Sequence, residues 1–152
     1  MTDQHASRKA LPKQHYRTVE WHLHNRATLY ETIRNGRRTI LDGGSSHDNG
    51  VPSGHSKHSD PTAVKGILLS DGTREMQRAT RWIAAIRDTE KYFSGGPEVL
   101  LLTHFYGGNI KVPEFMRKHG MTKTKFYDLR DRIVNHLAMQ AIGRGLIRMD
   151  RT

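Results

Sequence analysis

The sequence predicts an all-α protein, on two observations. First, apolar side chains recur at close to 3.6-residue intervals over 15–41 and again over 73–93, the spacing typical of amphipathic helices. Second, residues that typically begin or end helices recur elsewhere in the sequence, as at Asp60-Pro61 and Ser94-Gly95-Gly96. We therefore expect a long N-terminal helix, a flexible linker and a helical domain.

The N-terminal region is expected to be a basic tail over 1–14 followed by one helix over 15–41. The apolar face of this helix includes Tyr16, Val19 and Leu23, and its other face is rich in arginine. Gly36 is the only interruption. Glycine costs roughly 1 kcal/mol relative to alanine inside a helix, so it marks a predicted weak point.

Residues 42–60 are dominated by Gly, Ser, Asn, Asp and His, and they show no apolar period. A stretch this long without periodicity is typical of a flexible linker. Asp60 and Pro61 then suit the cap and first position of a helix.

The predicted domain over 61–145 contains a short helix at 62–69, a long helix at 73–93, and a buried apolar helix at 98–105. It ends in two helices over 112–141, and residues 146–152 form a tail.

The charge of +10 is concentrated at the two ends of the chain. Residues 1–41 carry eight basic and three acidic side chains, and residues 111–152 carry ten and four, whereas 42–110 is nearly neutral. An excess of this kind indicates a polyanionic partner, most often nucleic acid.

Residues 112–141 fit the spacing of a helix-turn-helix. Gly120 supplies the small residue that a tight turn between crossing helices requires. Apolar residues flank it at Phe115, Met116 and Met121, and Thr122 is a suitable N-cap for the second helix. An inner apolar stripe is expected at Phe126, Leu129, Ile133, Leu137 and Ala141.

The start of the second helix is the part of such a motif that enters the major groove of DNA. We assign base readout to five residues: Thr122, Lys123, Thr124, Tyr127 and Asp128. Asp128 can accept from cytosine or can orient a neighbouring arginine. Phosphate contacts are assigned to Lys111, Lys118, Lys125, Arg130 and Arg132.

The whole chain resembles the RinA-like family of phage late transcriptional activators. The resemblance lies in His15 to Trp21, in Asp60-Pro61-Thr62 with Ala63 and Lys65, and in Met121 to Tyr127. It implies a DNA-binding activator of packaging and virion genes, whose C-terminal half is similar to the promoter-reading domain of sigma factors. It also implies contact with promoter DNA and with bacterial RNA polymerase. The Gly/Ser/His linker departs from the family pattern.

Enzyme and metal functions are not predicted. The sequence contains no Walker-type loop, no G-x-S-x-G motif and no cysteine. His22 and His24 point in different directions on a helix. His55 and His58 fall in the linker, short of the four convergent ligands of a structural zinc site. We therefore expect no cofactor.

Two functions stay open at the level of sequence. The first is a transcription activator, as a monomer or homodimer. The second is a DNA-binding packaging component, such as a small terminase subunit that assembles into rings. The residues alone do not separate activation from repression. No signal peptide or membrane span is predicted, so we expect a chain in the cytoplasm of a bacterial host, associated with the nucleoid.

Overall fold

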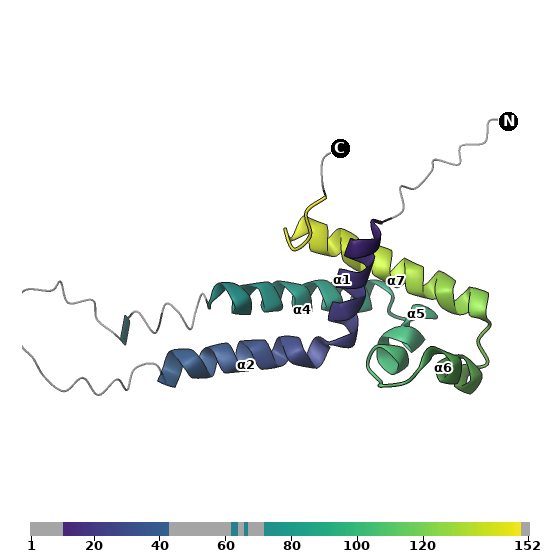
Figure 1. Cartoon of the computed structure of the whole chain (residues 1–152), viewed down its shortest axis with the longest axis horizontal. Coiled ribbons are helices and arrows are strands. Elements are labelled where there is room, and N and C mark those ends of the chain that lie inside the picture. Colours follow the sequence, from purple (N-terminus) through teal and green to yellow (C-terminus); the bar gives the residue numbers. More distant parts are fainter. Residues whose placement is uncertain (1–10, 43–61, 64–65, 67–71, 150–152) are drawn as a thin grey trace, which may run out of the picture. The chain divides into compact units, whose positions relative to one another are not determined.

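All regular secondary structure is helical in the part of the chain that the computed structural model describes, residues 11–42, 62–63, 66 and 72–149 (Figure 1). The all-α prediction is therefore confirmed for these residues. The elements are α1 (Lys13–His24), α2 (Arg26–Asp42), α4 (Arg74–Tyr92), α5 (Glu98–Leu100), a π-helix η1 (Leu101–Phe105), α6 (Val112–His119) and α7 (Lys123–Gly143).

Several predicted segments lie outside the described residues. They are the tail before residue 11, the linker from residue 43 onward with His55 and His58, and most of the 62–69 helix. Thr62, Ala63 and Gly66 of that helix are helical. None of the helices in the described ranges is long and apolar enough to cross a lipid bilayer.

The predicted single helix over 15–41 is two helices that meet at Asn25. Asparagine favours this break because its side-chain amide competes with the helix for backbone groups. The break is also where the chain passes from one compact unit to another. Gly36, the predicted weak point, does not interrupt α2.

The described residues form two compact units. Unit 1 comprises 11–24 and 85–149, and unit 2 comprises the described residues between 25 and 84. This differs from the expected domain over 61–145, because α1 joins the C-terminal helices and α2 joins the first part of α4. Helical periodicity shows that each segment has an apolar face, but not which partner covers it.

Unit 2 is held by one buried stripe on each of two helices. Leu29 and Ile40 of α2 are buried, as are Met76, Ala79 and Ile83 of α4. A β-carbon on Gly36 would lie only 2.4 Å from the Cγ and Sδ atoms of Met76. The glycine therefore allows the close approach of α2 and α4, which explains its place inside a helix.

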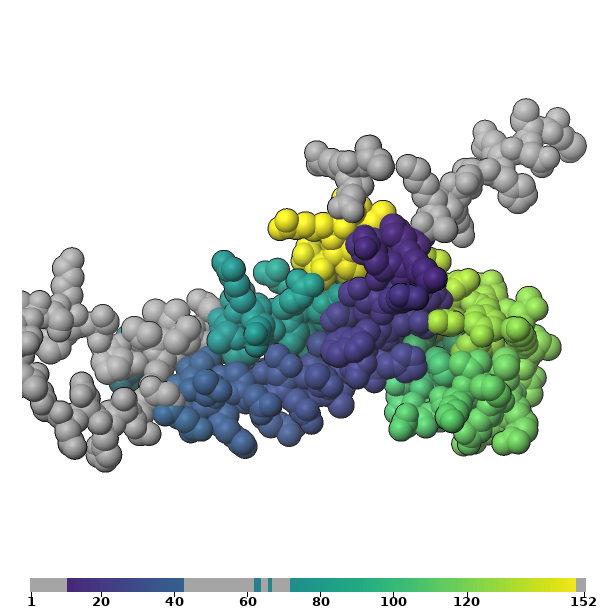
Figure 2. All heavy atoms as spheres, viewed as in Figure 1, coloured from purple at the N-terminus to yellow at the C-terminus, as the bar shows by residue number. Residues whose placement is uncertain are grey.

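Unit 1 is built around α7. The predicted inner stripe is confirmed, because Phe126, Leu129, Ile133, Leu137 and Ala141 are fully buried. Helix α1 packs against α7 and buries Val19 and Leu23 completely, and Figure 2 shows its surface lying against that of α7. Leu146 and Ile147 are also buried, so the predicted C-terminal tail begins with residues that belong to the core.

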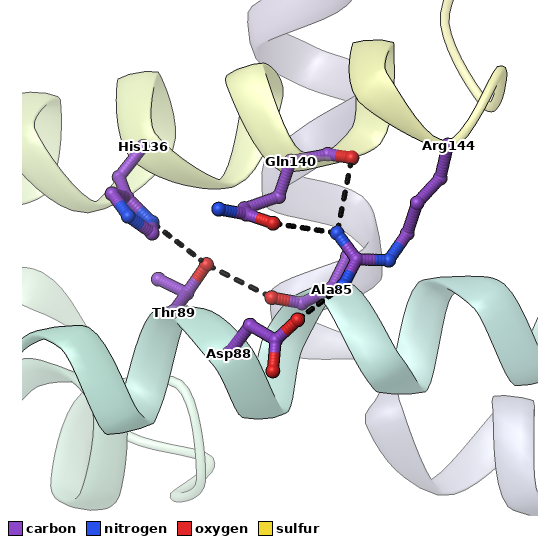
Figure 3. Close-up of polar contacts among 6 residues, drawn as sticks. All are labelled: Ala85, Asp88, Thr89, His136, Gln140 and Arg144. Atoms are coloured by element: carbon purple, nitrogen blue, oxygen red, sulfur yellow. Dashed lines mark hydrogen bonds and ion pairs between the residues drawn. The ribbon is translucent and has the colours of Figure 1, made fainter.

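The end of α4 is joined to α7 by polar contacts (Figure 3). The Thr89 hydroxyl donates to the Ala85 carbonyl at 2.9 Å, and its oxygen lies 3.1 Å from Nδ1 of His136. Because the single hydroxyl proton is already used, Nδ1 of His136 must be the donor in the second contact. Arg144 pairs with Asp88 and donates to the side chain of Gln140.

The predicted apolar helix over 98–105 is a short α-helix that continues as a π-helix. The Tyr106 amide donates to the Leu101 carbonyl at 2.9 Å, a bond to the fifth residue back. The expected burial is confirmed for Leu101, Leu102 and Phe105.

Candidate nucleic-acid interface

Helices α6 and α7 are joined by a tight turn at Gly120. The backbone of Gly120 is left-handed, with φ 59° and ψ 32°. Its amide donates to the Arg117 carbonyl, and the next amide, of Met121, donates to the Met116 carbonyl at 2.9 Å. This pair of bonds satisfies the last carbonyls of α6 in a Schellman motif, which requires the positive φ that glycine adopts without strain.

The first turn of α7 is capped by Thr122, as predicted. The threonine is extended, and its hydroxyl oxygen accepts from the Lys125 amide at 3.3 Å. The cap fixes the residue at which the helix starts. Thr122, Lys123 and Thr124 are therefore held on a defined turn, although all three are exposed.

Three phenylalanine rings pack α6 and α7 against η1. The ring of Phe105 lies 5.6 Å from that of Phe115 and 5.1 Å from that of Phe126, in edge-to-face arrangements. Phe115 and Phe126 are fully buried, and contacts of this geometry add to their burial energy. Met116 and Met121, which the spacing placed in the core, are only half-buried.

The predicted base-reading residues lie together on the exposed side of the first turns of α7. Lys123, Thr124, Tyr127 and Asp128 are exposed, and Tyr127 is 37% accessible. Lys111, Lys118 and Lys125 are exposed as well. This surface therefore combines lysine ammonium groups with hydroxyls from threonine and tyrosine, the donors that contact phosphates and base edges.

Arg130 is an exception among the predicted phosphate contacts. Its guanidinium donates to both carboxylate oxygens of Glu20, at 2.5 and 2.6 Å. The side chains of Arg130 and Glu20 are only 25% and 16% accessible. These hydrogen bonds raise the pKa of Arg130 above its usual value. A charge already neutralised in this way adds little to phosphate binding, so we withdraw Arg130 from the predicted set.

The Glu20–Arg130 pair belongs to a network that joins α1, α7 and Tyr106, the residue that follows η1. Tyr106 donates to Glu20 at 3.2 Å, and Tyr16 donates to Asp131 at 2.6 Å. Burial raises the pKa of both tyrosines, so their phenols remain protonated donors. The Arg130 guanidinium also lies 5.5 Å from the ring of Tyr127, on the candidate surface. The network therefore stabilises the part of α7 that adjoins its exposed first turns.

Asp128 and Arg132 are also paired. Arg132 bonds to Asp128 one turn away at 3.0 Å and to the buried Glu98 at 3.4 Å. Of the two predicted roles for Asp128, this geometry matches the orientation of a neighbouring arginine. The side chain of Arg132 remains 54% accessible, against 25% for Arg130, so Arg132 is still open to solvent.

His119 occupies the last turn of α6, where an apolar residue is usual in such a motif. Its ring packs against Phe115, with 4.5 Å between centroids, and against His104. Its Nε2 atom is buried and makes no hydrogen bond within the described residues. The half-buried imidazole therefore packs against the aromatic cluster at the end of α6.

No sequence pattern indicates the Glu20–Arg130 contact. The two residues are 110 positions apart, and neither periodicity nor a motif connects them. Comparisons with protein-family models, with curated proteins and with solved structures found no match to this chain.

Proposed function

We propose that the chain binds double-stranded DNA in a sequence-specific manner, with α6 and α7 acting as a helix-turn-helix. The observation that carries the proposal is the fixed and exposed first turn of α7. The glycine turn, the threonine cap and the phenylalanine cluster hold that turn in place. It presents Lys123, Thr124 and Tyr127 to solvent, and hydrogen bonds from such side chains can discriminate base edges.

Surrounding positive charge supports the same proposal. Lys125 is exposed on α7, Lys118 in the last turn of α6 and Lys111 at the N-terminus of α6, and residues 111–152 carry ten basic side chains against four acidic ones. Binding of duplex DNA draws most of its salt-dependent affinity from such contacts. We retain Lys111, Lys118, Lys125 and Arg132 as phosphate contacts.

We further propose that the protein activates phage late genes and contacts bacterial RNA polymerase. This step rests on the resemblance to RinA-like activators. A reporter tests it: the site that the protein selects from a random duplex library is placed upstream of a weak promoter. Increased transcription in the presence of the protein supports a role as an activator, and decreased transcription indicates a repressor.

Base readout is tested on the same selected site. We expect Lys123→Ala and Thr124→Ala each to weaken specific binding by about 1–3 kcal/mol. Lys118→Ala should weaken binding to every duplex and lower the slope of log affinity against log salt by about 1. Lys91→Ala, an exposed lysine at the end of α4, is the control. Unchanged affinities for all three test variants would refute the assignment.

The alternative function, a packaging component such as a small terminase subunit, shares the DNA-binding helices. It differs in assembly, because that function requires a ring. Light scattering on the purified chain separates the two: a monomer or homodimer supports the activator, and a stable octamer or larger ring supports the packaging component.

A further inference from the structure

Helix α2 carries a cluster of arginines that the proposed DNA-reading surface does not use. Arg34, Arg37 and Arg38 stand at positions i, i+3 and i+4 and are all exposed. Within the residues that the structure describes, no side-chain ion pair is found for any of them. Three cations within about one turn repel one another. Their clustering therefore lowers helix stability unless an anion binds there.

The charge is confined to one flank of α2. With 3.6 residues per turn, Thr28, Thr32 and Thr39 fall on the opposite flank, whereas Glu31 lies beside Arg38 on the arginine flank. Two of these threonine hydroxyls donate to carbonyls of the same helix, from Thr32 to Thr28 and from Thr39 to Asn35. A helix whose arginines served only solubility would not need to segregate them in this way.

The arginine flank borders an open groove of about 580 Å³. Its walls are formed by Tyr30, Ile33 and Leu41, and the tyrosine and leucine are 40% and 58% accessible. Asp42 lies at the end of the groove. Apart from Asp42, the charged residues of the groove are the three arginines, and such a cluster beside low-dielectric walls concentrates the electric field and attracts counter-ions. Guanidinium groups bind phosphate oxygens in a bidentate manner, which favours a phosphate polyanion.

We propose that the arginine flank of α2, defined as Arg34, Arg37 and Arg38, is a second, sequence-independent contact with the phosphate backbone of double-stranded DNA. The inference rests on the proposed function, because DNA held by α7 is the polyanion present at high effective concentration near the rest of the same chain. It concerns a different unit, so it can fail while the α7 assignment stands.

The test compares two triple variants with equal loss of charge. One is Arg34→Gln/Arg37→Gln/Arg38→Gln. The other, the matched control, is Arg74→Gln/Arg78→Gln/Arg81→Gln on exposed positions of α4 in the same unit. Affinity for a random-sequence duplex of about 30 base pairs is measured by fluorescence anisotropy over a range of salt concentrations, after circular dichroism has shown unchanged helicity.

If each arginine of α2 binds one phosphate, the slope of log affinity against log salt becomes shallower by about 2.7 in the α2 variant. It changes by less than about 1 in the α4 control. The charge-conserving Arg34→Lys/Arg37→Lys/Arg38→Lys variant restores most of the slope. Equal changes of the slope in both glutamine variants would show that it depends only on the net charge of the protein, and would overturn the proposal.

An unchanged slope in the α2 variant would also overturn it, and would assign the flank to an acidic protein partner instead. Lys118→Ala, measured in parallel, removes a charge from α6 and so reports on the α6–α7 surface alone. A change with Lys118→Ala and none with the α2 variant contradicts only the second contact. The reverse result contradicts the α7 assignment and leaves the arginine flank as the DNA contact.

Discussion

Glu20 and Arg130, 110 residues apart in the chain, share two hydrogen bonds of 2.5 and 2.6 Å and join α1 to α7. The pair is mostly buried, so solvent screens it weakly. Glu20 also accepts a hydrogen bond from the phenol of Tyr106. Helix α1 is therefore part of the support of the candidate DNA-binding helix rather than a separate arm.

Loss of the Glu20 carboxylate should destabilise unit 1. We expect Glu20→Ala to lower the free energy of unfolding by about 2 kcal/mol, the range for hydrogen bonds to charged groups. The measurement is denaturant unfolding followed by circular dichroism. Glu31→Ala, on the exposed flank of α2, is the control and should change stability by less than about 0.5 kcal/mol. Equal effects of the two substitutions would contradict the role assigned to Glu20.

Arg130 should contribute little to the salt dependence of DNA binding, because its charge is already paired. We expect Arg130→Met to leave the salt slope within about 0.3 of the unsubstituted chain, whereas Lys118→Met lowers it by about 1. Binding is measured at a temperature at which both variants are folded. A drop with Arg130→Met as large as that with Lys118→Met would return Arg130 to the phosphate contacts.

Local features of the site could be predicted from the sequence. Gly120, the Thr122 cap and the buried stripe of α7 depend on residues within a few turns of one another, and all three appear as expected. The partner of each helix could not be predicted in the same way. The apolar faces of α1 and α2 are continuous in periodicity, but they belong to different units.

The placement of Arg130 shows a second limit of the sequence. Its position on α7 suits a phosphate contact, and only the three-dimensional fold brings Glu20 to it. Gly36 shows a third. Its helix propensity indicates a weak point, but the neighbouring Met76 comes from a helix about forty residues further along the chain, and propensity contains no information about that contact.

The turn between α6 and α7 should be sensitive to backbone conformation rather than to space. A β-carbon on Gly120 would meet no atom within 4 Å, but its φ of +59° is strained for alanine. We expect Gly120→Ala to lower the free energy of unfolding by about 1–2 kcal/mol. Gly143 near the end of α7 has equally free space and no positive φ, so Gly143→Ala should be neutral or stabilising. Thermal unfolding of the two variants tests the contrast, which similar shifts would contradict.

The close contact in unit 2 should make Gly36 and Met76 interdependent. We expect Gly36→Ala to lower the free energy of unfolding by about 1 kcal/mol, because Met76 must move away from the new methyl group. In a Met76→Ala background the same substitution should be stabilising by up to about 1 kcal/mol, through helix propensity alone. A double-mutant cycle measures the coupling, and additive effects would show that the two helices do not meet at this point.

Stability should fall as the pH drops below about 6.5. Burial lowers the pKa of His136 from its ordinary value of about 6.5, although Asp88 partly opposes the shift. The unfolded chain therefore binds a proton where the folded chain does not, so stability is complete above the unfolded pKa and is lost as pH falls toward the folded one. Burial lowers the pKa of His24 in the same direction.

The measurement is the difference in free energy of unfolding between pH 7.5 and pH 5.5. His136→Gln should reduce this difference, whereas Asn135→Gln, a non-titrating substitution at the exposed neighbouring position of α7, should leave it unchanged. An undiminished pH dependence in His136→Gln would show that other groups cause it.

The π-helix η1 constrains the length of the chain in this region. A bond to the fifth residue back contains one residue more than a normal helical turn. Deletion of one residue between Leu101 and Phe105 would close the segment into an ordinary α-helix and rotate Leu101 by about 100° relative to Phe105. Leu101 and the three-phenylalanine cluster could then no longer be buried together. Homologous chains should therefore vary in composition at this segment more readily than in residue number.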